Sequence, residues 1–269
     1  NVQAGAGEGI NISNEEYTNA GATIVSDPKV LYDMADMVTK IRAPMPEEFS
    51  LMHDCILFSM FHSKQNPEHL YYAGLQNLVV VELERIQDSK NERIIDQTGI
   101  TGEIGVYYVL RHSQKMPADM KVVILGYGRV SSGAINACNK LFMKTKILRR
   151  AEYKFLDQYL ADADLLINGI AWSDGAMLKR KYIVTRDHIK NSFQNMIVLD
   201  LSVDFPNPIE TIRPTTYTQP YYIEEGRVHV SIYGYPGLVP ITSSRIYSKQ
   251  SEAPISLIAN NGGLKDIGT

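Results

Sequence analysis

The stretch 122–134 constrains the fold of this chain more than any other part of the sequence. An apolar run that ends at Leu125 leads directly into Gly126-x-Gly128, and a helical pattern follows. A continuous apolar run is typical of a parallel strand that is covered on both faces. Glycines at such a turn permit a tight bend and let a pyrophosphate approach the backbone at the helix N-terminus. We therefore predict a dinucleotide-binding unit here, rather than an ordinary strand–helix turn.

The third glycine of the usual pattern is replaced in this motif. Ser131 stands in its place, and Gly133 follows two residues later. Serine is small, so we expect the close packing of helix against strand to be kept. Arg129 and Val130, which open the helix, are expected to contact the dinucleotide together with the two glycines of the turn.

The next predicted strand, 145–148, is followed directly by Arg149 and Arg150. Enzymes that use NAD place an Asp or Glu at this point, on the ribose 2′-hydroxyl. A carboxylate would repel a 2′-phosphate, whereas arginine binds one bidentately. The pair therefore favours NADP(H) over NAD(H) as the cofactor. The competing explanation is that two basic residues begin a solvated helix.

Short apolar runs alternate with helical stretches along the chain, which predicts βαβ units and parallel sheets. Strands are expected at 37–41, 56–61, 78–81, 121–125, 145–148, 165–167, 197–199 and 228–232, and one helix at 101–115. A length of 269 residues suggests two domains. We predict an α/β protein of two Rossmann-like domains with a cleft between them. The expected parts are a substrate domain over 1–112, a doubly wound dinucleotide-binding domain over 113–240, and a tail over 241–269 that returns to the first domain and frays from about Ser248.

Composition narrows the classes of partner. The formal net charge of −3 gives no reason to expect nucleic acid or an anionic membrane as partner, and no apolar run is long enough to span a bilayer. Cys55 and Cys138 lie in apolar runs without metal-ligand spacing, so we expect buried thiols and no metal. The chain opens without a basic or apolar leader, so we expect a cytoplasmic location.

Several segments, in order from Val2 to about Tyr247, resemble alanine dehydrogenases and transhydrogenase alpha subunits. They are Val2–Gly9, Glu15–Tyr17, Ala20–Ala22, Lys40–Pro44, Phe58–His62, Asp200–Asp204, Glu210–Thr216 and Tyr235–Pro240. The glycine motif and Ile167-Asn168-Gly169-Ile170 are more similar to N5-(carboxyethyl)ornithine synthase, and Lys64-Gln65 resembles saccharopine dehydrogenases. Three departures are evident. The family's opening strand and helix have no counterpart, Arg42 replaces a lysine, and Gly234 replaces an asparagine.

The resemblance implies an oxidoreductase that uses NADPH to condense a 2-oxo acid such as pyruvate with the amino group of an amino acid. One alternative is alanine dehydrogenase, which aminates pyruvate reductively with NAD. Another, of a different class, is a non-catalytic nucleotide-binding subunit like the transhydrogenase alpha subunit. An amino acid and a 2-oxo acid are the expected partners, and relatives of this kind imply a homo-oligomer.

The resemblance also suggests which residues act. His62 would transfer protons, Arg42 with Lys40 would bind a carboxylate, and Asp204 would orient the amine, while Asn168 and Gly169 would contact the cofactor. Alternation along a strand should place the two cations on one face. The competing explanations are a structural histidine, solvated cations and a turn aspartate. We interpret Glu82, Glu84 and Asp96 as solvated, and of the three we keep only Asp96 as a site candidate.

Overall fold

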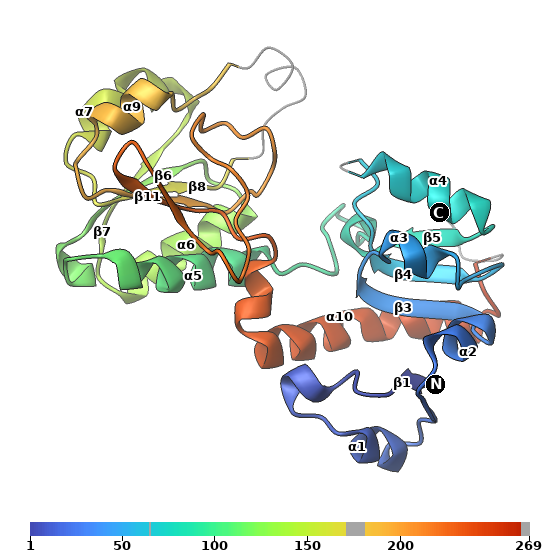
Figure 1. Ribbon diagram of the computed structural model, residues 1–269. Helices are drawn as coiled ribbons and strands as arrows, with labels where there is room; N and C mark the ends of the chain where they lie inside the picture. Colours follow the sequence, from blue (N-terminus) through green and yellow to red (C-terminus); the bar gives the residue numbers. More distant parts are fainter. Residues whose placement is uncertain (65, 171–180, 265–269) are drawn as a thin grey trace. The chain divides into compact units, whose positions relative to one another are not determined.

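The computed structural model describes residues 1–64, 66–170 and 181–264. Gln65, which forms part of the Lys64-Gln65 resemblance, thus lies outside the described residues. Contacts divide the chain into two compact units, which are described separately. Unit 1 comprises Asn1–Asp96 and Pro240–Thr269, and unit 2 comprises Gln97–Val239. Both are α/β, as predicted, and the described strands form three separate sheets (Figure 1).

Unit 2 contains a six-stranded sheet in the order β10-β11-β9-β8-β6-β7. Its strands are β6 (Lys121–Leu125), β7 (Lys144–Leu148), β8 (Leu165–Asn168), β9 (Ile197–Asp200), β10 (Tyr222–Glu224) and β11 (Arg227–Val230). Neighbours are parallel except for β10, which pairs antiparallel with β11. The chain passes from β6 to β7 on one side and then crosses to β8 on the other. The carboxyl end of β6 is therefore the switch point where open α/β sheets bind ligands.

Helices cover both faces of this sheet because β6 is apolar on both (Figure 1). Val122 and Ile124 pack toward α5 (Thr98–Val109) and α6 (Arg129–Lys140). Val123 and Leu125 pack toward α7 (Leu156–Leu160) and α9 (Arg186–Asn191). The described part of the unit also contains the short 3-10 helices η3 (Leu110–His112), η4 (Pro117–Asp119), η5 (Arg150–Phe155) and η6 (Tyr235–Leu238).

Helix α5 was expected to continue to residue 115 and to belong to the first domain as far as 112. The structure instead ends it at Val109 and places it in unit 2, which begins at Gln97. The physical reason is a close helix crossing. A Cβ added to Gly102 would lie 2.1 Å from the Val130 carbonyl oxygen, and one added to Gly133 would lie 2.1 Å from that of Gly99. Gly133 thus serves the contact between α5 and α6.

Unit 1 is built on a parallel sheet in the order β3-β4-β5. Its strands are β3 (Met37–Arg42), β4 (Ile56–Met60) and β5 (Val79–Glu82), and β1 (Val2–Gln3) pairs separately with β2 (Ile24–Val25). Its helices are η1 (Glu8–Ile10), α1 (Asn14–Asn19), α2 (Pro28–Asp33), α3 (Pro46–Phe49), α4 (Pro67–Leu75), η2 (Leu83–Arg85) and α10 (Pro240–Asn260). The capping box expected from Ser13 and Glu16 begins α1.

Strand β4 sends alternate side chains to two cores. Leu57 packs with residues of α2, α3 and α4, whereas Phe58 packs on the other face with Ile258 of α10. The tail was expected to fray from Ser248, but it is helical as far as Asn260 (Figure 1). The sequence did not predict this helix, because its apolar residues are sparse and it contains an internal proline. Packing against the β3-β4-β5 sheet stabilises it.

Candidate functional site

The turn after β6 has the backbone that its glycines predict. Gly126 has a φ of +87°, a left-handed conformation that glycine adopts without strain. Its N–H donates to the Leu148 carbonyl at 3.1 Å, and an added Cβ would lie 2.8 Å from Ile170 Cγ1. At Gly128, by contrast, an added Cβ would meet no atom of the described residues within 4 Å. The packing of the described residues therefore leaves space beside Gly128.

Gly128 is also the N-cap residue of α6, and as a glycine it has no side chain with which to cap the first turn of this helix. Uncapped N–H groups and the positive end of the helix dipole suit an anionic ligand. The open space and the uncapped helix of 12 residues together fit the pyrophosphate of a dinucleotide. Arg129 and Val130 form the first turn of this helix, as expected.

Ser131 fits at this position because the residue opposite it, Gly169, has no side chain. Ser131 is fully buried, and its hydroxyl has no hydrogen-bond partner among the described residues. A Cβ on Gly169 would lie 2.1 Å from Ser131 Oγ, so only glycine fits there. In this chain the close packing that a third glycine usually permits is made possible by Gly169, which leaves room for the Ser131 side chain. Gly169 therefore has a packing function in addition to any contact with a cofactor.

Asn168 is engaged with the protein itself. Its Nδ2 donates to Asp200 Oδ1 at 2.8 Å and to Ser202 Oγ at 3.2 Å, while its Oδ1 accepts from the Ile170 N–H at 3.1 Å. Ser231 Oγ donates to the second oxygen of Asp200 at 2.7 Å. This buried network fixes the ends of β8, β9 and β11, and the Asn168 carbonyl oxygen also accepts from the Leu201 N–H at 2.9 Å, so the structure shows a structural role for Asn168.

Arg149 and Arg150 follow β7 directly, at the edge of the sheet beside the glycine turn. Both side chains are exposed, and within the described part of the chain neither is in an ion pair. The nearby Glu152 accepts from the Arg149 backbone N–H at 3.0 Å and pairs with Lys146 at 2.8 Å. Both guanidinium groups therefore remain available to an anion at the place predicted for the ribose.

Asp204 lies just beyond the carboxyl end of β9 and is half-buried. Its carbonyl oxygen accepts from Asn207 Nδ2 at 3.2 Å. The preceding Val203 has a φ of +52°, which is rare for a β-branched residue, and its N–H donates to Asp200 Oδ2 at 3.2 Å. Strained residues held by their surroundings concentrate at functional sites. The buried Asp200, which the sequence interpretation passed over, thus fixes the turn that presents Asp204.

His62 and Arg42 belong to the carboxyl edge of the β3-β4-β5 sheet in unit 1. Arg42 ends β3 in register with Met60 of β4, and His62 lies two residues beyond that strand. Because the strands are parallel, their carboxyl ends share one edge of the sheet. His62 is another non-glycine residue with a positive φ, at +52°.

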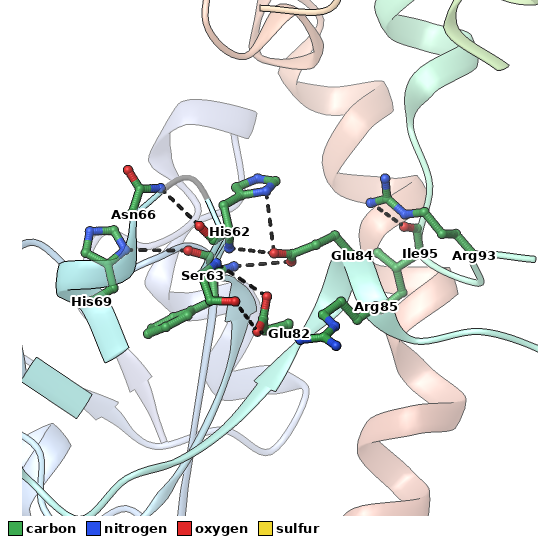
Figure 2. A network of polar contacts seen from close by, with 10 residues as sticks. His62, Ser63, Asn66, His69, Glu82, Glu84, Arg85, Arg93 and Ile95 are labelled. Atoms are coloured by element: carbon green, nitrogen blue, oxygen red, sulfur yellow. Dashed lines mark hydrogen bonds and ion pairs between the residues drawn. The ribbon is translucent and has the colours of Figure 1, made fainter. Parts of the chain in front are cut away.

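The turn at His62 is held by acidic side chains from β5 and η2 (Figure 2). Glu84 accepts hydrogen bonds from the backbone N–H groups of Phe61, at 3.2 Å, and of His62, and its Oε1 lies 3.4 Å from His62 Nδ1. Glu82 accepts from Ser63 Oγ at 2.7 Å. Burial alone would raise the pKa of Glu82, but the hydrogen bonds from Ser63 hold it below its ordinary value.

The interpretation of Glu82 and Glu84 as solvated is therefore wrong. Each side chain is only 12% exposed. Glu82 ends β5 and Glu84 lies in the following η2, at the same edge of the sheet as His62. Both carboxylates therefore accept hydrogen bonds from the turn after β4 instead of from water. Two acidic residues with alternate spacing after an apolar run could have indicated this, because they mark the carboxyl end of a strand that is parallel to β4. Asp96 is likewise engaged, since its backbone exchanges two hydrogen bonds with the Gln250 amide.

Lys40 does not lie as predicted. The register shifts between Thr39 and Arg42, and this irregularity breaks the alternation expected to place Lys40 and Arg42 on one face. Lys40 instead pairs with Glu48 and donates to the Tyr32 hydroxyl at 3.3 Å. Burial would raise the pKa of Glu48, but hydrogen bonds led by that from Lys40 lower it. These contacts give Lys40 a role in packing α2 and α3 on the sheet.

Two further findings bear on the kind of site. Among the described residues no group of three His, Cys, Asp or Glu side chains is arranged to hold a metal ion. No described helix is both long and apolar enough to cross a membrane.

Sequence comparison matches both ends of the chain to one family. Residues 1–102 match the alanine dehydrogenase/PNT N-terminal domain, and residues 142–268 match the C-terminal domain. The chain is 27% identical to alanine dehydrogenase of Bacillus subtilis, across 99% of this chain and 79% of that protein. It is 23% identical to N(5)-(carboxyethyl)ornithine synthase of Clostridium botulinum, across 96% and 88%.

Structural comparison agrees on the fold. An L-alanine dehydrogenase structure superposes with a TM-score of 0.83 at 22% identity, covering 97% of this chain and 81% of the other. A transhydrogenase from Sinorhizobium meliloti gives a TM-score of 0.79 at 20% identity, covering 93% and 81%.

Proposed function

Because the chain belongs to the alanine dehydrogenase/PNT family, we propose that it is a pyridine-nucleotide-dependent oxidoreductase acting on the C–N bond of an amino acid. The observation that carries this proposal is the glycine turn at the switch point of the unit 2 sheet. The space that the described residues leave beside Gly128, and an α6 N-terminus without a side-chain cap from its N-cap glycine, suit a dinucleotide pyrophosphate. A bound nicotinamide would supply or accept the hydride.

For the cofactor we propose NADP(H) in preference to NAD(H). The exposed Arg149 and Arg150 support this choice, since they follow β7 where the adenosine ribose is expected. Planar guanidinium groups match the geometry of a 2′-phosphate. No acidic residue stands at these two positions to accept a 2′-hydroxyl.

Two substrate pairs follow from the relatives. Reductive amination of pyruvate by ammonia is supported by similarity to several alanine dehydrogenases. Condensation of a 2-oxo acid with the amine of an amino acid is supported by the N(5)-(carboxyethyl)ornithine synthase relative and by the turn at 167–170. Both reactions form and reduce a C=N bond, so the same residues serve either one.

The residues divide the work by chemistry. We assign proton transfer to His62, a side chain suited to exchange near neutral pH. Arg42 is assigned to the substrate carboxylate, which guanidinium binds bidentately. Asp204 is assigned to the amine, because a carboxylate stabilises an ammonium or iminium charge.

The test is a matrix of 2-oxo acids against ammonia and amino acids, with NADPH and NADH, in which cofactor oxidation is followed and products are identified by mass. Alanine as product supports reductive amination, and a secondary amine supports condensation. Tight nucleotide binding without turnover of any pair would contradict the enzymatic proposal and favour a nucleotide-binding subunit.

Variants then test the roles. His62→Ala should lower turnover about 10²–10⁴-fold, the usual contribution of a positioned acid–base group. NADPH affinity should stay nearly unchanged, because His62 lies in unit 1 and the glycine turn in unit 2. Arg42→Ala should raise the KM of the carboxylate substrate. Full activity of His62→Ala across pH would rule out its assignment.

A further inference from the structure

The backbone at His62 is held in place from both sides. On its N–H side, the Glu84 carboxylate accepts from two consecutive amides, those of Phe61 and His62. On its carbonyl side, Asn66 donates to the His62 oxygen from its backbone N–H at 3.0 Å and from Nδ2 at 3.4 Å (Figure 2). A positive φ at a non-glycine residue persists only where surrounding contacts determine it. Glu84 is one of those contacts.

The same carboxylate also faces the imidazole ring. Glu84 Oε1 lies 3.4 Å from His62 Nδ1, while the Glu84 side chain is only 12% exposed and the His62 side chain is 38% exposed. A largely buried carboxylate beside one ring nitrogen favours a proton on that nitrogen. The other nitrogen, Nε2, then carries a lone pair and belongs to the more exposed side chain of the two.

We propose that Glu84 is the positioning residue of His62, holding both its backbone turn and its ring so that Nδ1 carries the proton and Nε2 exchanges protons with the substrate. This inference rests on the proposed function, in which His62 is the proton-transfer group. In that reaction Nε2 accepts a proton from the substrate or returns one, and Nδ1–H keeps its hydrogen bond to Glu84 throughout. Glu84 itself touches no reacting atom.

Glu82 provides a matched control. It has the same side chain, the same 12% exposure and a place two residues earlier in the chain. Its carboxylate bonds to Ser63 and, at 3.4 Å, to Arg85 rather than to the histidine ring, and it also contacts the Glu84 carboxylate (Figure 2). If a buried glutamate beneath this turn acts only through stability, the two should behave alike.

The first measurement is the tautomer of the neutral His62 ring, from ¹⁵N shifts of histidine-labelled full-length protein without substrate. The His62 signals are those lost in His62→Ala. We expect protonation on Nδ1 in the unmodified protein, a move toward Nε2 protonation in Glu84→Gln, and a clearly smaller change in Glu82→Gln. Protonation on Nε2 in the unmodified protein, or equal changes in both variants, would overturn the proposal. This outcome is decided whether or not the protein turns over any substrate.

The second measurement is the division between kcat and KM. Glu84→Gln should lower kcat by about 10²-fold, the low end of the range for acid–base catalysis, and leave KM nearly unchanged. Glu82→Gln keeps a side-chain oxygen that can accept from Ser63, so it should lower kcat much less than Glu84→Gln does. Glu84→Asp keeps the charge but is one methylene shorter, so it should show the same tautomer change if Glu84→Gln does not fold. An unaltered kcat in a folded Glu84 variant would contradict the positioning role.

Discussion

A change at Arg150 tests whether the cofactor is NADP(H) or NAD(H). Its guanidinium is exposed at the end of β7 and is expected to bind the 2′-phosphate of NADPH. Arg150→Asp should weaken NADPH binding by about 10- to 100-fold, since a charge-assisted hydrogen bond contributes roughly 1.5–3 kcal/mol. The dissociation constants of NADPH and NADH, measured by fluorescence titration, check this.

Lys144→Asp is the matched control for this charge reversal. Lys144 is also exposed, but it begins β7 at the opposite edge of the sheet. Its replacement should leave the ratio of NADPH to NADH affinity unchanged. Equal affinity of the unmodified protein for the two nucleotides would remove the basis for assigning Arg149 and Arg150 to a phosphate.

His229 predicts an acid sensitivity of folding. It is fully buried on β11, with Nε2 2.8 Å from Thr211 Oγ1 and Nδ1 2.9 Å from the Arg227 carbonyl oxygen. Burial lowers the pKa of His229 to about 4 from an ordinary 6.5. The unfolded chain therefore takes up this proton at a higher pH than the folded chain does. Stability should fall as pH drops from about 6.5 toward 4.

Between pH 7 and pH 5 this one group should reduce the free energy of unfolding by about 2 kcal/mol. Urea unfolding at several pH values measures the loss. His229→Gln should show a shallower dependence on pH in this window, whatever its stability at pH 7. An identical slope in the variant would show that other groups cause the sensitivity.

Single residues also show where sequence reasoning succeeds. Gly126 and Gly128 could be predicted because their roles depend on local backbone and on the adjoining strand and helix. The contacts of Glu84 with His62 could not, because they join residues 22 positions apart in the sequence through strand pairing. The pairing of Lys40 with Glu48 depends in the same way on a register shift that no periodicity reveals.

At the level of elements, the crossing of α5 and α6 depends on missing side chains. Gly133→Ala should destabilise unit 2 by about 1–3 kcal/mol, because its Cβ would meet the Gly99 carbonyl oxygen and backbone cannot easily yield. Gly99→Ala is the control, since its own Cβ would meet no atom of the described part of the chain within 4 Å. That change should be neutral or stabilise the helix by up to about 1 kcal/mol.

Thermal unfolding of the two variants, compared with the unmodified protein, measures this difference. Equal melting temperatures for Gly133→Ala and Gly99→Ala would show that the crossing relaxes without cost. The sequence predicted both helices, but not their contact. It also missed β10, since a strand of three residues joined to β11 by a turn at Glu225 and Gly226 presents too short a pattern.

At the level of the whole molecule, unit 2 is continuous and unit 1 is not. Residues 97–239 contain both cores of the nucleotide unit, which pack on the two faces of its own sheet. A fragment of these residues should fold and bind NADPH about as tightly as the full chain. It should show no turnover, because His62 and Arg42 belong to unit 1.

Circular dichroism and nucleotide titration of this fragment, beside the full chain, measure the outcome. A fragment that is unfolded, or that binds NADPH far more weakly, would show that unit 2 depends on unit 1. The sequence could suggest two domains from length and repeated βαβ patterns. It could not place the boundary at Asp96, because the apolar face of α5 does not reveal which core it joins.

The position of α10 at the end of the chain affects the order in which the two units fold during translation. The outer face of the β3-β4-β5 sheet is covered by α10, which follows the whole of unit 2 in the chain. A nascent chain that has passed residue 239 but not yet released α10 from the ribosome has its second unit complete while Phe58 and Leu83 still lack Ile258 as a partner. Residues 1–96, which are translated before unit 2, therefore complete their packing last, and until then one apolar face of their sheet stays exposed.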